Sequence, residues 1–176
     1  MPNWTTNLLC ITGNAPSLRQ CLNAIKSDLP LPFGQHISFH KILPVPPILQ
    51  NSTFANGTGK QAVQFMEKGL YPAGDPKRQA SIRPFTEEEQ EAFDALGVED
   101  MIDWQIKNWG CRGDACRTCL DGLIDERGEA YIRFETAWSP PTGILRALRV
   151  MFPDLGFNMR FRLEDDPEYP HDVDDF

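Results

Sequence analysis

Three cysteines in the middle of the chain could hold a metal. Cys111, Cys116 and Cys119 are spaced as C-x4-C-x2-C, the spacing of three of the four ligands of a plant-type 2Fe–2S cluster. No cysteine follows Cys119 to supply the fourth ligand, and the two upstream cysteines fall in segments expected to be buried, where cysteine behaves as a small apolar residue. We therefore expect free thiols, with no metal and no cofactor. The alternatives are a metal-binding module on these three cysteines or a disulfide between Cys116 and Cys119.

Two tryptophans, Trp109 and Trp138, stand where predicted helices and strands meet. In one interpretation both indoles pack in the core. In the other they form a binding surface with Asp114 and Ser139, because an indole combines a large apolar area with a polar N–H and often anchors interfaces. The Ser139 hydroxyl is also a suitable helix N-cap. No Ser-His-Asp spacing indicates a nucleophile, so we assign no catalytic residue and do not expect an enzyme. An enzyme of unknown reaction is an alternative.

The net charge of −8 is concentrated near the C-terminus. Residues 164–176 carry seven carboxylates and no lysine or arginine, and removing these seven charges leaves −1 for residues 1–163. A segment with such dense like charge is predicted to be disordered. Its Glu164, Asp165 and Asp166 are candidate contacts for a basic surface on a partner. The nearly neutral remainder lacks the basic surface of a nucleic-acid-binding protein, so we do not expect direct binding to nucleic acid.

The composition is that of a globular protein. A chain of 176 residues with 41% hydrophobic residues is long enough for one domain with a core. No stretch approaches the roughly 20 apolar residues of a membrane span, and the first residues lack the basic and apolar regions of a secretory signal. We therefore expect a cytoplasmic protein with no membrane contact.

Hydrophobic periodicity predicts an alternation of strands and helices. The first expected elements are a strand at 7–12, a helix capped by Asn14 with Leu22 on its buried stripe, and a strand at 36–43. A short helix near 60–69 within an exposed insertion follows, then a helix opened by the capping box of Thr86 and Glu89 and a helix at 98–109. The last elements are a cysteine-bearing loop at 111–119, a hairpin at 122–138, a helix after Ser139 and a strand at 157–164. Two helices on one face of a mainly antiparallel sheet give the ferredoxin-like α+β arrangement. The predicted domain is residues 1–163, with a helical insertion at about 50–109, followed by the acidic tail.

Four stretches of the chain resemble the YubB-like family of plasmid and phage proteins. They are MPNWTTNLLCITG, FHKILPVPPIL, WQIKNWGCRGDA and FETAWSPPTGILRALRVMFPDLGFNMRFRLED. The resemblance runs almost from end to end and implies a ferredoxin-like domain encoded on a mobile genetic element, but it implies no reaction. The family usually continues Asn-Trp-Gly with Thr-Lys-Trp-Asp-Ala. Cys111 and Gly113 therefore look like substitutions in a family that does not use cysteine there.

These observations lead to one functional expectation. We expect a non-enzymatic protein of a mobile genetic element that binds a host macromolecule. The expected partner is a host protein, and interference with host defence is one outcome of such binding. The acidic charge favours a basic protein surface over nucleic acid as the partner.

Overall fold

The computed structural model describes residues 3–28, 36–50, 52–54, 62–65, 81–84, 86–120 and 128–175. The chain divides into two compact units, one formed by Met1–Pro44 with Ile106–Phe176 and the other by Val45–Gln105. The sequence predicts one domain with an insertion at about 50–109. Most of that insertion lies in the second unit, Val45–Gln105. None of the described helices is long and apolar enough to cross a membrane.

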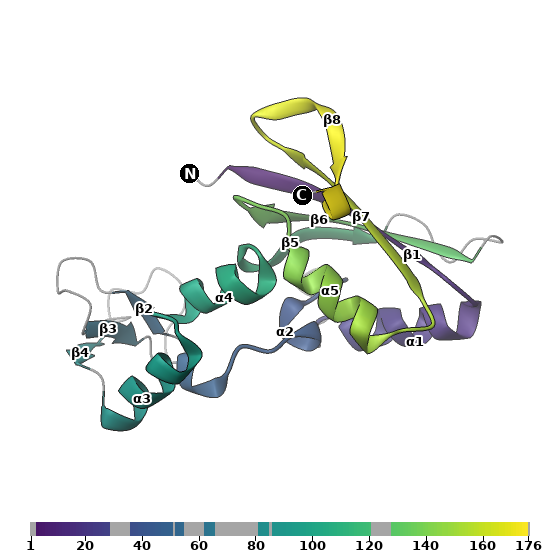
Figure 1. Cartoon of the computed structure of the whole chain (residues 1–176). Coiled ribbons are helices and arrows are strands. Elements are labelled where there is room, and N and C mark those ends of the chain that lie inside the picture. Colours follow the sequence, from purple (N-terminus) through teal and green to yellow (C-terminus); the bar gives the residue numbers. More distant parts are fainter. Residues whose placement is uncertain are drawn as a thin grey trace. The chain divides into compact units, whose positions relative to one another are not determined.

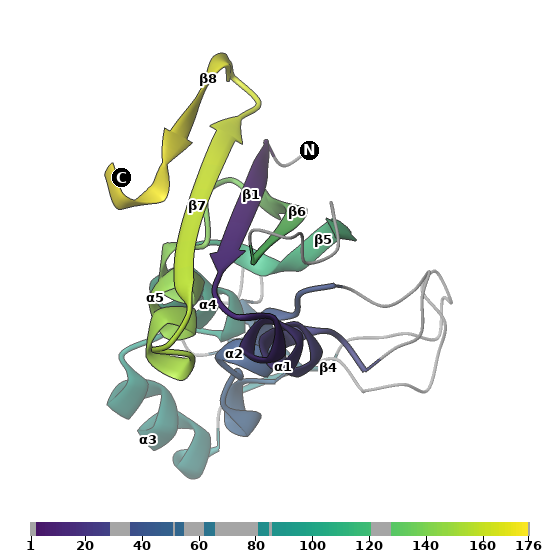
Figure 2. The same ribbon diagram turned by 90° about the vertical axis from the view of Figure 1, so that its right-hand side faces the viewer.

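The larger unit contains a five-stranded antiparallel sheet with the strand order β5-β6-β1-β7-β8. Its strands are β1 (Trp4–Thr12), β5 (Arg112–Leu120), β6 (Glu129–Ala137), β7 (Gly156–Leu163) and β8 (Asp166–Asp172), and its helical elements are α1 (Ala15–Ile25), α2 (Phe39–Ile42), the end of α4 (Met101–Trp109), α5 (Thr142–Met151) and the 3-10 turn η2 (Val173–Asp175). Helices α1, α2 and α5 lie on one face of this sheet (Figures 1 and 2). The predicted α+β class, with an antiparallel sheet and helices, is confirmed.

The first strand and helix follow the predicted pattern. Side chains of β1 alternate between buried and more exposed positions, as expected for a strand with one face on the core. The Asn14 side chain accepts a hydrogen bond from the Ser17 amide at 2.9 Å and caps α1. Leu18 and Ile25 are fully buried. Leu22, predicted to be buried with them, is only partly buried, so the buried stripe of α1 is narrower than expected.

Residues 36–43, predicted as a strand, contain the short helix α2 instead. Phe39 is fully buried, so the apolar pattern did indicate burial. The Asp114 carboxylate on β5 accepts hydrogen bonds from the Phe39 amide at 2.6 Å and from the Ser38 hydroxyl at 2.8 Å. These bonds satisfy the Phe39 amide and the Ser38 hydroxyl at the start of α2. The partner comes from a distant strand, which is why the local pattern suggested the wrong element.

The cysteine-bearing stretch, predicted as a loop, is strand β5. Its pairing with β6 shifts register between Arg112 and Cys116 and again between Cys116 and Cys119. Gly113 and Arg117 have positive φ angles of 82° and 48°. Such irregularities interrupt the alternation of buried and exposed residues, so no strand pattern is visible in the sequence. Strand β6 matches the second arm of the predicted hairpin, whereas the first arm lies largely outside the described residues.

The acidic segment, predicted to be disordered, is ordered over residues 166–175. Strand β8 pairs with β7, and Val173 in η2 is buried. The carboxylates with a specific partner are Glu164 with the Trp4 amide, Asp165 with the Asn3 side chain, Asp166 with His171, Asp172 with Asn158, and Asp174 with Arg149. Composition records the charge of the segment but not the donors that the fold brings to it.

The second unit contains a three-stranded antiparallel sheet with the order β2-β3-β4. Its elements are the 3-10 turn η1 (Pro47–Leu49), β2 (Ser52–Phe54), β3 (Ala62–Phe65), β4 (Ser81–Pro84), α3 (Glu87–Leu96) and the first part of α4. The capping box of Thr86 and Glu89 is confirmed, and α3 ends at Gly97 with a φ of 62°. The helix predicted near 60–69 is wrong over 62–65, which form β3, and its other positions lie outside the described residues.

Candidate binding surface

Trp109 lies in the core and cannot be part of an exposed surface. Its side chain is fully buried, and the Phe39 ring meets it edge to face with centroids 5.5 Å apart. The indole N–H donates a hydrogen bond to the Leu43 carbonyl at 2.8 Å. This environment satisfies both the apolar area and the polar group of the indole. The alternative in which Trp109 packs in the core is therefore the correct one.

The Asp114 and Ser139 side chains form hydrogen bonds to groups far away in the sequence. Besides its bonds to α2, the Asp114 carboxylate accepts a hydrogen bond from the Ala115 amide at 2.8 Å. The Ser139 hydroxyl donates to the Gly110 carbonyl at 2.6 Å. It is not the N-cap of α5, because Pro141 occupies that position. The Asp114 and Ser139 side chains thus make hydrogen bonds within the fold, whereas the Trp138 side chain is exposed.

The three cysteines, Cys111 just before β5 and Cys116 and Cys119 within it, have different environments. Cys111 is fully buried, and burial, with a smaller contribution from Asp114, raises the pKa of its thiol to about 12. Burial, followed by Glu135, also raises the pKa of Cys116, while Cys119 is exposed. A raised pKa disfavours the thiolate, which is the form that binds metals. Within the described residues, no three His, Cys, Asp or Glu side chains are grouped so that they could hold a metal ion.

Trp138 is exposed, unlike Trp109. Its side chain is 54% accessible, and the residue has a φ of 75°, which is uncommon for a bulky L-residue. The Trp138 amide donates to the Asn3 carbonyl at 2.8 Å. Trp4 lies opposite Ala137 in the pairing of β1 with β6, so the start of β1 is next to the turn that carries Trp138.

The end of β7 lies beside the start of β1 (Figure 2), and two of the acidic candidates, Glu164 and Asp165, follow β7 directly. The Glu164 amide donates to the Trp4 carbonyl at 3.1 Å, and the Glu164 carboxylate accepts from the Trp4 amide at 2.9 Å. The Asp165 carboxylate accepts from the Asn3 side chain at 2.5 Å. We call the surface formed by Asn3, Trp4, Trp138, Glu164 and Asp165 the tryptophan end. The carboxylate of the third acidic candidate, Asp166, instead lies 3.1 Å from the His171 Nε2 atom, within hydrogen-bond distance.

Arg117 extends the tryptophan end, and neither Arg117 nor Trp4 was identified as a candidate from the sequence. The Arg117 guanidinium lies over the Trp4 ring, 5.3 Å from its centroid, and pairs with the Glu135 carboxylate at 2.7 Å. Arg117 is in the irregular part of β5, and bulges commonly redirect a side chain in this way. Trp4 itself could have been identified, because the alternation along the first strand places it on the face opposite the buried Thr5.

Buried polar groups fix the turn that carries Trp138. The Asn7 side-chain amide donates to the Thr136 hydroxyl at 2.9 Å, and that hydroxyl donates to the Ser139 carbonyl at 2.8 Å. Asn7 and Thr136 are both fully buried, so these hydrogen bonds form in a setting where an unmade bond would be costly. The Thr136–Ser139 bond therefore closes the turn across Trp138, and Asn7 ties it to the first strand.

The described side chains of the tryptophan end are mainly of three kinds. These are indoles, carboxylates that already accept hydrogen bonds, and one arginine stacked on an aromatic ring. Comparisons of the chain with protein-family models, with curated proteins and with solved structures found no match.

Proposed function

We propose that the protein acts by binding another protein through the tryptophan end, without catalysing a reaction. The observation that carries this proposal is Trp138, which is 54% exposed while its φ is 75°. The left-handed conformation costs an L-residue about 1–2 kcal/mol, and glycine would remove that cost. A strained backbone that holds a large apolar side chain in solvent is better explained by contact with a partner than by stability.

The surroundings of Trp138 support a particular kind of partner. Tryptophan is enriched among the residues that contribute most to protein–protein affinity, and Trp4 supplies a second indole nearby. The carboxylates of Glu164 and Asp165 are each held by a hydrogen bond from the start of β1. Side chains that are already ordered lose less conformational entropy on binding. This surface suits an apolar side chain flanked by lysine or arginine on the partner.

We also propose that the larger unit has a ferredoxin-like fold. Among its first four strands in chain order, the fourth pairs with the first, the first with the third and the third with the second. Helix α1 follows the first of these strands and α5 connects the third to the fourth. This succession supports the β-α-β-β-α-β pattern of that fold, with β8 as an additional strand at the edge.

The resemblance to the YubB-like family supports a gene carried on a plasmid or phage. On that basis the partner is a host protein in the cytoplasm. Proteins of host defence and restriction systems are the first to examine, because a mobile element gains most by blocking them.

Affinity capture from a host-cell lysate with quantitative mass spectrometry tests the proposal. The baits are the wild-type chain, Trp138→Ala and the control Val150→Ala. Val150 lies in the last turns of α5 and is 83% exposed, so both variants remove an exposed apolar side chain. The same protein should be enriched by the wild type and by the Val150 variant, and lost with the Trp138 variant. Equal enrichment by all three baits would contradict the proposal.

The role of the carboxylates is tested with the captured partner. Glu164→Gln retains an acceptor for the Trp4 amide and removes the charge. The variant should associate more slowly at low salt and show a weaker salt dependence, because exposed charges act mainly on association. An unchanged rate at low salt would contradict the electrostatic part of the proposal. Direct binding of the purified chain to nucleic acid at about 150 mM salt would contradict its choice of partner.

A further inference from the structure

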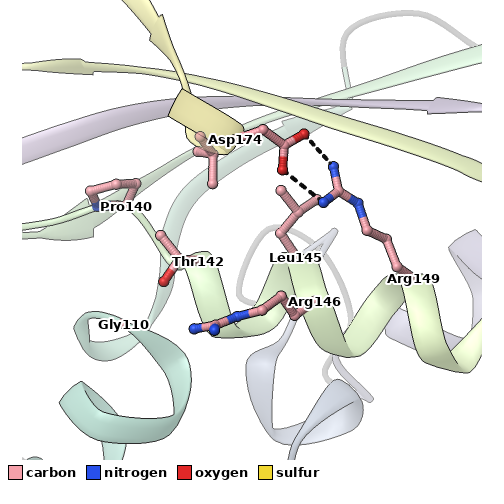
Figure 3. A pocket seen from close by; sticks show the side chains of 8 residues that line it. Gly110, Pro140, Thr142, Leu145, Arg146, Arg149 and Asp174 are labelled. Atoms are coloured by element: carbon pink, nitrogen blue, oxygen red, sulfur yellow. Dashed lines mark hydrogen bonds and ion pairs between the residues drawn. The ribbon is translucent and has the colours of Figure 1, made fainter. Parts of the chain in front are cut away.

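We infer that a pocket on α5 binds a carboxylate that carries an apolar group. The pocket has a volume of about 390 Å³ and is lined by residues of α5, η2 and the Gly110 and Pro140 junctions (Figure 3). Pockets for small ligands usually measure about 300–1,000 Å³. No residue of the tryptophan end lines this pocket, so the inference does not depend on the proposed function.

One arginine of the pocket already holds a carboxylate of the chain itself. The Arg149 guanidinium donates to both carboxylate oxygens of Asp174, at 2.7 and 2.6 Å, and also to the Phe157 carbonyl at 3.0 Å. The Arg149 guanidinium holds the pKa of Asp174 below its usual range. This pair shows that a guanidinium on this side of α5 can meet a carboxylate in the two-pronged geometry that arginine favours.

A second arginine, one turn earlier on α5, has no such partner. Arg146 is exposed, and within the described residues it makes no hydrogen bond or ion pair. Its guanidinium extends along the pocket on the side of Thr142 (Figure 3), and the Thr142 hydroxyl likewise has no partner in the described part of the chain. Arg146, Arg149 and Asp174 together carry one net positive charge. The pocket therefore favours a ligand with one negative charge.

The rest of the pocket wall is apolar. Leu145 and Val173 are buried beside it, and Pro140 contributes to the wall near Thr142. A carboxylate that accepts hydrogen bonds from Arg146 and Thr142 would place its attached carbon chain against these apolar side chains. Two kinds of ligand share this chemistry: a small organic acid and the free C-terminus of a peptide that ends in an apolar residue.

Nuclear magnetic resonance titration of the ¹⁵N-labelled full chain tests the inference. The probes are hexanoate, its neutral counterpart hexanamide, and a short peptide ending in valine, as the free acid and as the amide. Hexanoate or the peptide acid should cause saturable shifts of the Thr142, Arg146 and Val173 amide signals, and the neutral counterparts should not. Arg146→Gln should weaken binding about tenfold or more, the effect of removing a charged hydrogen bond.

The control variant is Arg19→Gln, which removes an exposed arginine of α1 outside the pocket. It should retain the wild-type affinity, and the amide spectrum of each variant shows whether it is folded. Stronger binding of hexanoate would identify a small acid as the better ligand, and stronger binding of the peptide acid would identify a chain end; either result supports the site. The inference is overturned if no probe gives saturable shifts, if hexanamide binds as well as hexanoate, or if Arg19→Gln weakens binding as much as Arg146→Gln.

Discussion

Two short segments of the larger unit are alike in sequence and opposite in environment. In each, a tryptophan precedes a small residue at a junction between elements: Trp109 ends α4 and precedes Gly110, and Trp138 follows β6 and precedes Ser139. Trp109 is fully buried, whereas Trp138 is 54% exposed with a φ of 75°. The difference arises because α2 brings Phe39 and the Leu43 carbonyl to Trp109. The burial of a tryptophan is thus set by what distant segments bring to it.

The two junctions are also in direct contact. The Ser139 hydroxyl donates to the Gly110 carbonyl at 2.6 Å, and Gly143 packs against the backbone of Asn108. The buried junction at Trp109 and Gly110 therefore helps to fix the position of the exposed junction at Trp138 and Ser139. Substitutions should lower stability most at the buried junction, less at the contacts between the junctions, and least at Trp138.

The largest effect is expected for Trp109→Ala. Removing a fully buried indole leaves a cavity and an unpaired Leu43 carbonyl, so the free energy of unfolding should fall by about 3–5 kcal/mol. Urea denaturation followed by circular dichroism measures this loss. A loss below about 1 kcal/mol, the size expected of a tolerant site, would mean that Trp109 is not part of the core.

Gly143→Ala should have the next largest effect. A Cβ at this position would overlap the carbonyl of Asn108, a backbone atom that cannot rotate away. Overpacking of this kind costs about 1–3 kcal/mol. The same denaturation experiment should show this loss, while Val150→Ala on the same helix should leave stability unchanged. Equal stability of the two variants would contradict the close contact between α4 and α5.

Ser139→Ala removes the hydrogen bond between the junctions. Because a single hydrogen bond contributes about 1 kcal/mol net, the free energy of unfolding should fall by about that amount. The melting temperature and urea midpoint report the change. If both are unaltered, the Gly110 carbonyl does not depend on this serine.

The smallest change in stability is expected for Trp138→Gly. Relief of the left-handed backbone should offset the lost contacts of the half-buried indole, so stability should change by less than about 1 kcal/mol. Trp138→Ala keeps the strain and is the matched comparison. The glycine variant should be the more stable of the two, and the reverse order would show that the backbone at this position is not strained.

The sequence predicted those elements whose stabilising contacts are local. The cap at Asn14, the box of Thr86 and Glu89 and the alternation along β1 and β7 all depend on residues within a few positions of each other. Helix α2 depends on Asp114, and the order of the acidic segment depends on donors such as Asn3 and Arg149. Those partners are more than 20 residues away, so periodicity and composition could not indicate them.

Three residues of the tryptophan end were binding candidates from the sequence, Trp138 in one predicted surface and Glu164 and Asp165 in the acidic segment. Trp138, Glu164 and Asp165 do lie at one end of the sheet, because β6 and β7 end on either side of the start of β1. The sequence left open whether Trp109 joins Trp138 in a surface or packs in the core, because its burial depends on contacts with Phe39 and Leu43. Arg117 was missed because only the bulge in β5 carries its side chain to Trp4.

We propose that the exposed Trp138 side chain binds a protein partner. The most direct measurement is the dissociation rate of the captured partner from immobilised wild type, Trp138→Ala and Val150→Ala. Loss of a dominant interface residue should speed dissociation about 30-fold for the Trp138 variant, equivalent to ~2 kcal/mol, with no change for the Val150 variant. Equal dissociation rates for wild type and Trp138→Ala would contradict the account.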